Sequence, residues 1–337
     1  MSISFLLFIG FPRKNTIVLL RKKGNPMNKI EMRKKENLTI EEAFALFIRK
    51  CRVKNLTELS ISSYENKITH FYEFTDKTGL VSDITKDTID DYILWLRDHT
   101  EANDITINSY LRTVRAFLYY CMECNYISSF KISLIKAEKK IKETYSEEDL
   151  IKLLQKPDVN RCTFSNYKTW VFENYLLGTG NRISTALNVK IGDINFESGV
   201  ITLRKTKNRK QQIIPLSQTL SDILTEYLEY RGGKEDDYLF CNEYGEKASE
   251  RTYQQLVRRY NIKRNVNCTS CHSFRHTFAK SWILNNGDMF RLQKILGHSD
   301  LTVTKEYVQM FGHDLQLDFE KFNPLDNINH KGQHIKM

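Results

Sequence analysis

The chain has 337 residues, of which 41% are hydrophobic and 27% charged, so it is long enough for two domains that each bury a core. This composition excludes a chain that is disordered over most of its length. The 51 Lys and Arg residues outnumber the 41 Asp and Glu residues, which leaves a formal net charge of +10 at pH 7. A polyanion is therefore the expected partner, and nucleic acid fits best, although membrane-surface proteins and basic enzymes share this balance.

The N-terminal segment 1–36 is predicted to be an extension outside the folded domains. Its apolar run, Ile3 to Phe11, lacks a preceding basic region and is far shorter than the ~20 residues of a spanning helix. We therefore expect neither a signal peptide nor a membrane anchor. Met27 is an alternative start of the chain. The odd number of cysteines, seven, together with the missing signal predicts free thiols in a cytoplasmic protein.

Residues 37–130 are predicted to form a small all-α domain. Thr39 and Glu42 have the spacing of a capping box, and the apolar residues that follow recur on one helix face. Three more helices are expected over Ile61 to Phe74, Ile89 to Arg97 and Ile107 to Cys124.

Residues 131–145 are predicted to be a basic linker between two domains. Between positions 131 and 142 the chain has one acidic residue, Glu138, and five lysines, namely Lys131, Lys136, Lys139, Lys140 and Lys142. A linker with this charge can follow the phosphates of a nucleic acid. Ser146 and Asp149 have the spacing of a second capping box, at which the next domain begins.

Residues 146–325 are predicted to form a mixed α/β domain that is mostly helical, followed by a C-terminal tail at 326–337. Helices are expected over Glu147 to Leu154 and around Tyr167 to Leu177, and Gly180 ends the second of them. Val200 to Leu203 and Gln212 to Leu216 are expected to form a hairpin around a polar turn. The predicted fold class is therefore mainly α, with one small β-hairpin sheet.

Cationic side chains at three places in the second domain suit a phosphate-binding site. Arg182 begins an apolar helix face, where the helix N-terminus adds its own positive end. A solvated arginine at a helix end is the simpler alternative. Lys207 lies in the hairpin turn, from which it can reach a bound substrate and protonate a leaving oxygen. His272 and Arg275 are three residues apart in a helical run, so both can grip one phosphate.

A histidine and a tyrosine near the C-terminus complete this set. The apolar helix face 292–296 ends at Gly297, and His298 opens the next segment. A further helix is expected to carry Tyr307, which is by itself more typical of a core or surface residue. Together the residues pair one nucleophile with five cations, as an attack on a phosphodiester requires.

Cys268, Cys271 and His272 match the Cys-x-x-Cys-His pattern of c-type haem attachment. Haem attachment requires export, and nothing in the sequence directs export. A zinc site would combine Cys268 and Cys271 with Cys121 and Cys124. The latter two lie on an apolar helix, where buried thiols need no metal. We therefore expect neither a metal site nor a cofactor.

The order and spacing of these residues resemble the tyrosine recombinase (phage integrase) family. The resemblance spans roughly Leu38 to Leu325, and the helical domain is similar to the SAM-like core-binding domain of that family. Three segments carry it in the second domain: Thr179 to Ser184, His272 to Ala279, and Leu296 to Val308.

Two departures concern the surroundings of Arg182. Many relatives have Leu before this arginine and an acidic residue three positions after it, whereas this chain has Asn181 and Thr185. The positions of Asn181 and Thr185 support the arginine, so these two departures affect the fine geometry of the site. The linker also lacks the Asn-Pro that often closes the first domain.

The resemblance implies a site-specific DNA recombinase with the catalytic residues Arg182, Lys207, His272, Arg275, His298 and Tyr307. Tyr307 attacks the scissile phosphate, which leaves a 3′-phosphotyrosyl link and a free 5′-hydroxyl. The arginines neutralise the non-bridging oxygens, and His272 accepts the proton of Tyr307. Lys207 protonates the leaving oxygen, and His298 donates a hydrogen bond to the phosphate.

The resemblance also implies the partners. The segment 108–115 is similar to the DNA-facing helix of the family, and the expected contacts to double-stranded DNA come from Asn108, Arg112, Arg115, Lys136, Lys139 and Lys140. Strand exchange needs four protomers, which predicts a homotetramer on synapsed DNA sites, with accessory proteins as further candidates. A helix over Asp314 to Phe322 is expected to dock on a neighbouring protomer or on its own domain.

Two alternatives remain open at this point. One is a catalytically silent DNA-binding adaptor on the same scaffold, and the other is a type IB topoisomerase-like enzyme that relaxes supercoils. Within the recombinase hypothesis, mobile-element integration and excision, chromosome-dimer resolution and inversion are all compatible with the sequence.

Overall fold

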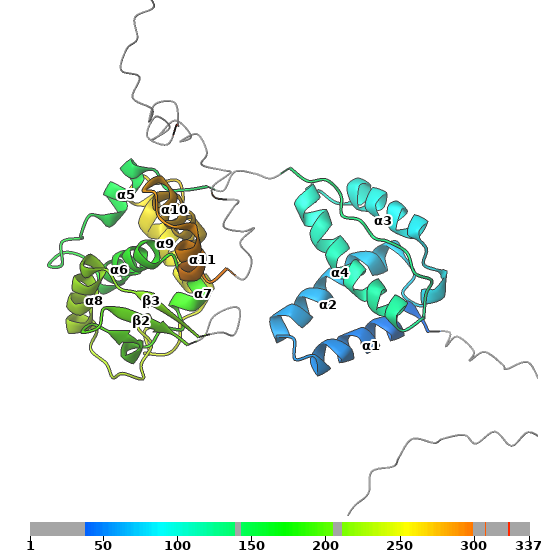
Figure 1. Ribbon diagram of the computed structural model, residues 1–337, viewed down its shortest axis with the longest axis horizontal. Coiled ribbons are helices and arrows are strands. Elements are labelled where there is room, and N and C mark those ends of the chain that lie inside the picture. The colour runs from blue at the N-terminus through cyan, green and yellow to red at the C-terminus, as the bar shows by residue number, and fades with distance from the viewer. Residues whose placement is uncertain (1–37, 139–142, 205–210, 299–306, 308–322, 324–337) are drawn as a thin grey trace, which may run out of the picture. The chain divides into compact units, whose positions relative to one another are not determined.

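A computed structural model describes residues 38–138, 143–204, 211–298, 307 and 323. The chain separates into two compact units, Met1–Lys139 and Lys140–Met337 (Figure 1). The predicted extension 1–36, the predicted tail 326–337 and the helix expected over Asp314 to Phe322 lie outside the described residues. Lys139, Lys140 and Lys207 also lie outside them.

The first unit is helical, as predicted. It contains α1 (Ile40–Val53), α2 (Glu58–Phe74), a 3₁₀ turn η1 (Val81–Asp83), α3 (Lys86–His99) and α4 (Asp104–Glu123). The predicted capping box of Thr39 and Glu42 is present at the start of α1. The other three helices begin three residues before their predicted starts. Their polar caps, Thr57, Thr85 and Asn103, precede the first apolar residue, so the apolar periodicity does not reveal them.

Aromatic side chains form much of the core of this unit. Helix α4 contacts α1 and α2, and the ring of Phe117 on α4 meets the rings of Phe44 and Phe47 on α1. Tyr92 of α3 meets Phe71 of α2 edge to face. Such edge-to-face pairs add to the stabilisation that burial provides.

The first part of the predicted linker packs onto this helical unit. Ile132 is buried in its core, and Leu134 and Ile135 pack against it. The backbone of Ile135 is held by the side chain of Asn108. The boundary between the two units lies after Lys139, within the predicted linker 131–145.

In the second unit, the other helices pack around one central helix, and a small sheet lies at one side (Figure 1). Its elements are α5 (Glu147–Leu154), α6 (Phe164–Thr179), α7 (Ile183–Ala186), η2 (Ile191–Asp193), β1 (Ile194–Asn195), β2 (Val200–Leu203), β3 (Gln212–Pro215), α8 (Gln218–Arg231), α9 (Glu250–Ile262), α10 (Cys271–Leu284) and α11 (Met289–Leu296). The sheet is antiparallel in the order β1-β2-β3. The predicted hairpin pairs Ile201 with Ile214, and the two-residue strand β1 is an addition that was not predicted.

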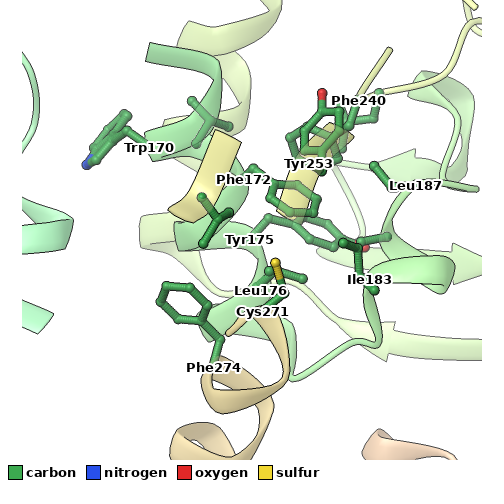
Figure 2. Close-up of a cluster of buried hydrophobic side chains, with 14 of the residues drawn as sticks. Trp170, Phe172, Tyr175, Leu176, Ile183, Leu187, Phe240, Tyr253, Cys271 and Phe274 are labelled. Carbon is green, nitrogen blue, oxygen red and sulfur yellow. The ribbon is translucent and has the colours of Figure 1, made fainter. Parts of the chain in front are cut away.

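Helix α6 is the central element, because it contacts α5, α7, α8, α9 and α10. Its residues Phe172, Tyr175 and Leu176 lie in the buried cluster that Figure 2 shows, beside Phe240 and Cys271. The helix ends at Gly180, which has a positive φ of 62°. Arg182 lies two residues later, so the core packing of α6 fixes the backbone position of this arginine.

Candidate active site

Arg275 is the buried centre of the candidate site, with 3% of its surface exposed. Its Nη1 donates a hydrogen bond to the carbonyl of Gly180, and its Nη2 donates one to the carbonyl of Leu296, both at 2.8 Å. These carbonyls lie at the C-terminal ends of α6 and α11, where backbone acceptors lack partners within the helix. One guanidinium group therefore fixes the ends of two helices.

His298 accepts a third hydrogen bond from the same guanidinium. Its Nε2 lies 2.7 Å from Nη2 of Arg275. An arginine side chain only donates hydrogen bonds, so Nε2 is the acceptor and is unprotonated. The imidazole then carries its proton on Nδ1. The predicted hydrogen bond from His298 to a phosphate would come from Nδ1, or from Nε2 after a change of partner.

Tyr307 lies beside this pair and is 1% exposed. Its ring is parallel to the imidazole of His298, with 6.3 Å between the ring centroids and 5° between the planes. Its hydroxyl lies 2.8 Å from Nδ1 of His276. Tyr307 belongs to a small buried cluster with Ala279, Leu292 and Leu296, against which Phe278 packs.

Two guanidinium groups act electrostatically on Tyr307. Burial lowers the pKa of Arg182, and a negative charge on Tyr307 would raise it. Burial, followed by the charge of Arg182, lowers the pKa of Arg275 to about 10, and Tyr307 again acts in the opposite direction. The structure thus brings together Arg182, Arg275, His298 and Tyr307. In this partly desolvated setting a negative charge on the tyrosine oxygen is stabilised.

His272 lies one helical turn before His276 on α10. The side chain of Ser270 caps this helix and accepts a hydrogen bond from the backbone N–H of His272. The ring centroids of His272 and His276 are 5.8 Å apart. His272 also lines a cavity of about 370 Å³ together with Gln254 and Arg258.

His276 is the residue of this site that the sequence analysis missed. It directly follows Arg275, and it lies four positions after His272, which places both imidazoles on one face of α10. This spacing was the available signal. No local pattern indicates that the hydroxyl of Tyr307, 31 residues further along the chain, is its partner.

Lys207 lies outside the described residues, but both ends of its hairpin are anchored. Arg204 at the end of β2 forms an ion pair with the buried Asp193. Gln212 at the start of β3 donates to the carbonyls of Lys294 at 2.6 Å and Ile295 at 2.7 Å. The hairpin base is therefore tied to η2 on one side and to the end of α11 on the other.

The predicted DNA-binding residues differ in their accessibility. Arg112 and Lys136 are exposed, and Arg115 is partly exposed. Asn108 is buried, with its amide donating to the carbonyl of Ile135 at 2.9 Å and accepting from its N–H at 3.0 Å. A DNA contact through Asn108 would have to break this paired contact.

The cysteines of the two sequence pairs lie in different units. Cys121 is in the core of the first unit, and Cys268 and Cys271 are in the core of the second. Burial raises the pKa of Cys121 and of Cys271 to about 12. Among the described residues, no three His, Cys, Asp or Glu side chains are grouped so that they could hold a metal ion.

In the described part of the chain, no helix combines sufficient length with sufficient hydrophobicity to cross a bilayer.

Comparison with protein families gives two adjoining matches. The model of the phage integrase family matches residues 144–313, and that of the phage integrase SAM-like domain matches residues 42–141. Among curated proteins, tyrosine recombinase XerD of Staphylococcus haemolyticus is 27% identical over 297 residues, which cover 85% of this chain and 99% of XerD. XerD of Staphylococcus epidermidis is 25% identical with the same coverage.

Solved structures share the fold at lower identity. The XerH site-specific recombinase bound to palindromic difH substrate is 22% identical, with a TM-score of 0.65 over 80% of this chain and 81% of XerH. The Tn1549 transposon integrase in complex with a circular intermediate DNA is 20% identical, with a TM-score of 0.65 over 79% of this chain and 94% of the integrase.

Proposed function

The chain belongs to the phage integrase family and is a tyrosine recombinase, and we propose that it cuts and rejoins DNA at specific sites with Tyr307 as its nucleophile. One observation carries the assignment of the nucleophile. The hydroxyl-bearing side chain of Tyr307 is enclosed by two guanidinium groups and two imidazoles, from Arg182, Arg275, His298 and His276. A tyrosine that is exposed to solvent, or that only packs in the core, does not require these guanidinium and imidazole groups around it.

In the cleavage step, the oxygen of Tyr307 forms a bond to phosphorus while the bond from phosphorus to the 5′-oxygen breaks. Arg182 and Arg275 stabilise the charge that builds on the non-bridging oxygens. Lys207 gives a proton to the leaving 5′-oxygen. The phosphodiester energy is kept in the 3′-phosphotyrosyl link, so that a 5′-hydroxyl of a second strand can reverse the step without an energy source.

Arg275 is suited to this role because its position is fixed before substrate binds. Its three bonds, to Gly180, Leu296 and His298, hold the guanidinium in one orientation. They use three of its five N–H donors. A preorganised cation in a water-poor site stabilises a transition state without the cost of reorganisation.

We further propose that the first unit and the segment after it hold the duplex. Arg112 and Arg115 on α4 and the lysines 136, 139 and 140 would contact phosphates, which supply most of the affinity and no sequence information. Lambda integrase, which shares the fold at 15% identity, has been solved as a tetramer bound to a Holliday junction. This supports a homotetramer on two DNA sites as the active form of the present protein.

The test begins with the DNA site, which can be selected from random duplexes by binding to the full chain. A nicked suicide version of the selected duplex should then trap a covalent complex with the wild type, and the Tyr307→Phe variant should bind without trapping. An uncleaved duplex after selection, or trapping by the variant, would overturn the proposal. Joining of strands between two duplexes separates a recombinase from a topoisomerase-like enzyme, which would only relax supercoils.

A further inference from the structure

We propose that His276 is the group that accepts the proton of Tyr307 when the nucleophile attacks. This inference rests on the proposed function, and it deepens it by assigning a residue that the sequence analysis left out. The resemblance gave the role of general base to His272, one helical turn earlier on α10. The observation behind the assignment of His276 is the 2.8 Å distance between its Nδ1 and the hydroxyl of Tyr307.

The other side chains around Tyr307 are less suited to take its proton. Arg182 and Arg275 are cations that only donate hydrogen bonds. The Nε2 of His298 already accepts a bond from Arg275 at 2.7 Å, and its ring lies parallel to that of Tyr307. His276 is within hydrogen-bond distance of the hydroxyl, and it offers a lone pair when Nε2 carries its proton.

Burial of Tyr307 gives this contact its importance. The side chain is 1% exposed, so bulk water has little access to its hydroxyl. A proton that leaves the phenol must then pass to a neighbouring side chain. The charges of Arg182 and Arg275 favour a negative charge on the oxygen of Tyr307. Transfer to Nδ1 of His276 places the proton on the face of α10 that also carries His272.

The proposed step is balanced in protons and bonds. The O–H bond of Tyr307 breaks as an N–H bond forms at Nδ1 of His276, and the oxygen of Tyr307 forms its bond to phosphorus. The bond to the 5′-oxygen breaks, and this oxygen receives a proton from Lys207. In religation the incoming 5′-hydroxyl returns a proton to Lys207, and the imidazolium of His276 returns its proton to Tyr307.

The decisive variant is His276→Asn. The amide of asparagine can occupy the place of Nδ1 and keep a hydrogen bond to Tyr307, but it accepts no proton at neutral pH. We expect covalent trapping at pH 7 to slow roughly 100- to 10,000-fold, the range of general base catalysis, with DNA binding unchanged. His99→Asn is the matched control, because His99 contacts Trp95 on α3 in the other unit. It should trap DNA at the wild-type rate.

The pH dependence separates a base from a residue that merely holds the tyrosine. Raising the pH removes the phenol proton without a base, so the defect of His276→Asn should shrink between pH 7 and pH 9.5. The charged and titratable groups that face this contact, Arg182, Arg275, His272 and His298, are the same in both proteins. Wild-type trapping by the variant, or a defect of equal size at every pH, would overturn the inference.

A second measurement needs neither activity nor a folded variant of His276. Long-range proton–nitrogen spectra of the free wild-type protein should show Nδ1 of His276 unprotonated and hydrogen-bonded, and its nitrogen shift should move in Tyr307→Phe. A protonated Nδ1 at neutral pH would contradict the assignment. Failure of the wild type to trap any selected duplex would instead count against the proposed function, so the two failures are distinguishable.

Discussion

Nη2 of Arg275 lies 2.7 Å from Nε2 of His298, and the same nitrogen donates to the carbonyl of Leu296 two residues earlier in the chain. The arginine thus holds both the end of α11 and the imidazole that follows it. His298 is in turn stacked over Tyr307. The position of the proposed nucleophile therefore depends on an arginine that also maintains the fold, and changes at Arg275 should affect stability and catalysis together.

The first prediction concerns Arg275→Lys. Lysine keeps the charge, but its single ammonium group cannot span the carbonyls of Gly180 and Leu296. At least one buried carbonyl loses its partner, which should lower the free energy of unfolding by about 2 kcal/mol. Urea denaturation in a Trp95→Phe background would measure this, because the remaining tryptophans, Trp170 and Trp282, lie in the second unit.

Arg161→Lys is the control for this measurement. The side chain of Arg161 is 88% exposed and faces Asp158 at 3.5 Å, so its replacement should change stability by less than about 0.5 kcal/mol. Equal stabilities of the two lysine variants would show that the bonds of Arg275 do not hold the helix ends.

The second prediction compares two glycines that both have a positive φ. The φ angle is 62° at Gly180 and 63° at Gly199. A Cβ at Gly180 would lie 2.7 Å from the ring of Phe278 and 2.9 Å from Leu296, whereas a Cβ at Gly199 would make only an ordinary contact with the carbonyl oxygen of Leu216 at 3.8 Å. Gly199→Ala should cost about 1 kcal/mol for the positive φ alone. Gly180→Ala should cost about 1–3 kcal/mol more through overpacking.

The same denaturation assay measures both alanine variants. Gly180→Ala should also slow covalent trapping, because the displaced carbonyl is an acceptor for Arg275. Equal stability of the two variants would contradict the predicted destabilisation by overpacking at Gly180.

The third prediction is a pH dependence of stability that originates at Glu173. This side chain is fully buried in α6, and neither of its carboxyl oxygens has a hydrogen-bond partner among the residues that the structure describes. Burial raises the pKa of Glu173 well above its ordinary value, and only the charge of Arg264 opposes this shift. The folded state therefore keeps the proton at pH values where the unfolded state, with a glutamate pKa of about 4.3, has lost it. Stability must then fall as the pH rises above that value.

Glu173→Met removes this titration and keeps an unbranched side chain in the core. The variant should be more stable than the wild type, and its advantage should grow between pH 5.5 and pH 8 by at most about 1.4 kcal/mol per pH unit. A stability difference that is constant over this range would contradict the assignment.

The fourth prediction tests the DNA-facing surface of the first unit. Arg112 is exposed on α4, so Arg112→Ala should weaken binding to all duplexes by a similar factor. The plot of log affinity against log salt concentration should lose about one unit of slope, as for one lost phosphate contact. Arg52→Ala is the control, because the 60% exposed side chain of Arg52 pairs with Glu65. An unchanged slope for Arg112→Ala would remove this residue from the phosphate contacts.

Much of the fold followed from local patterns. The helix faces and the polar caps at Thr39 and Ser146 are properties of a few neighbouring residues, and the structure contains both caps. The hairpin was predicted from two apolar runs around a polar turn. The strand β1 was missed because two residues give no alternation to detect.

Contacts between distant segments could not be predicted in the same way. Asn108 looked like a surface residue of a DNA-facing helix, but its amide is paired with the backbone of Ile135, 27 residues later. The bond between His276 and Tyr307 likewise joins residues that are separated by a whole helix. Arg275 was predicted as a phosphate ligand, whereas its bonds to two helix ends become visible only when α6, α10 and α11 are packed together.

The most direct test of the account is the identification of the residue that becomes linked to DNA. After trapping on the selected suicide duplex, digestion with trypsin and nuclease should leave a nucleotide on the peptide that contains Tyr307, and fragmentation should place its phosphate on the tyrosine oxygen. We expect this adduct in the wild type and none in Tyr307→Phe. A nucleotide on any other residue, or an adduct that persists in the phenylalanine variant, would contradict it.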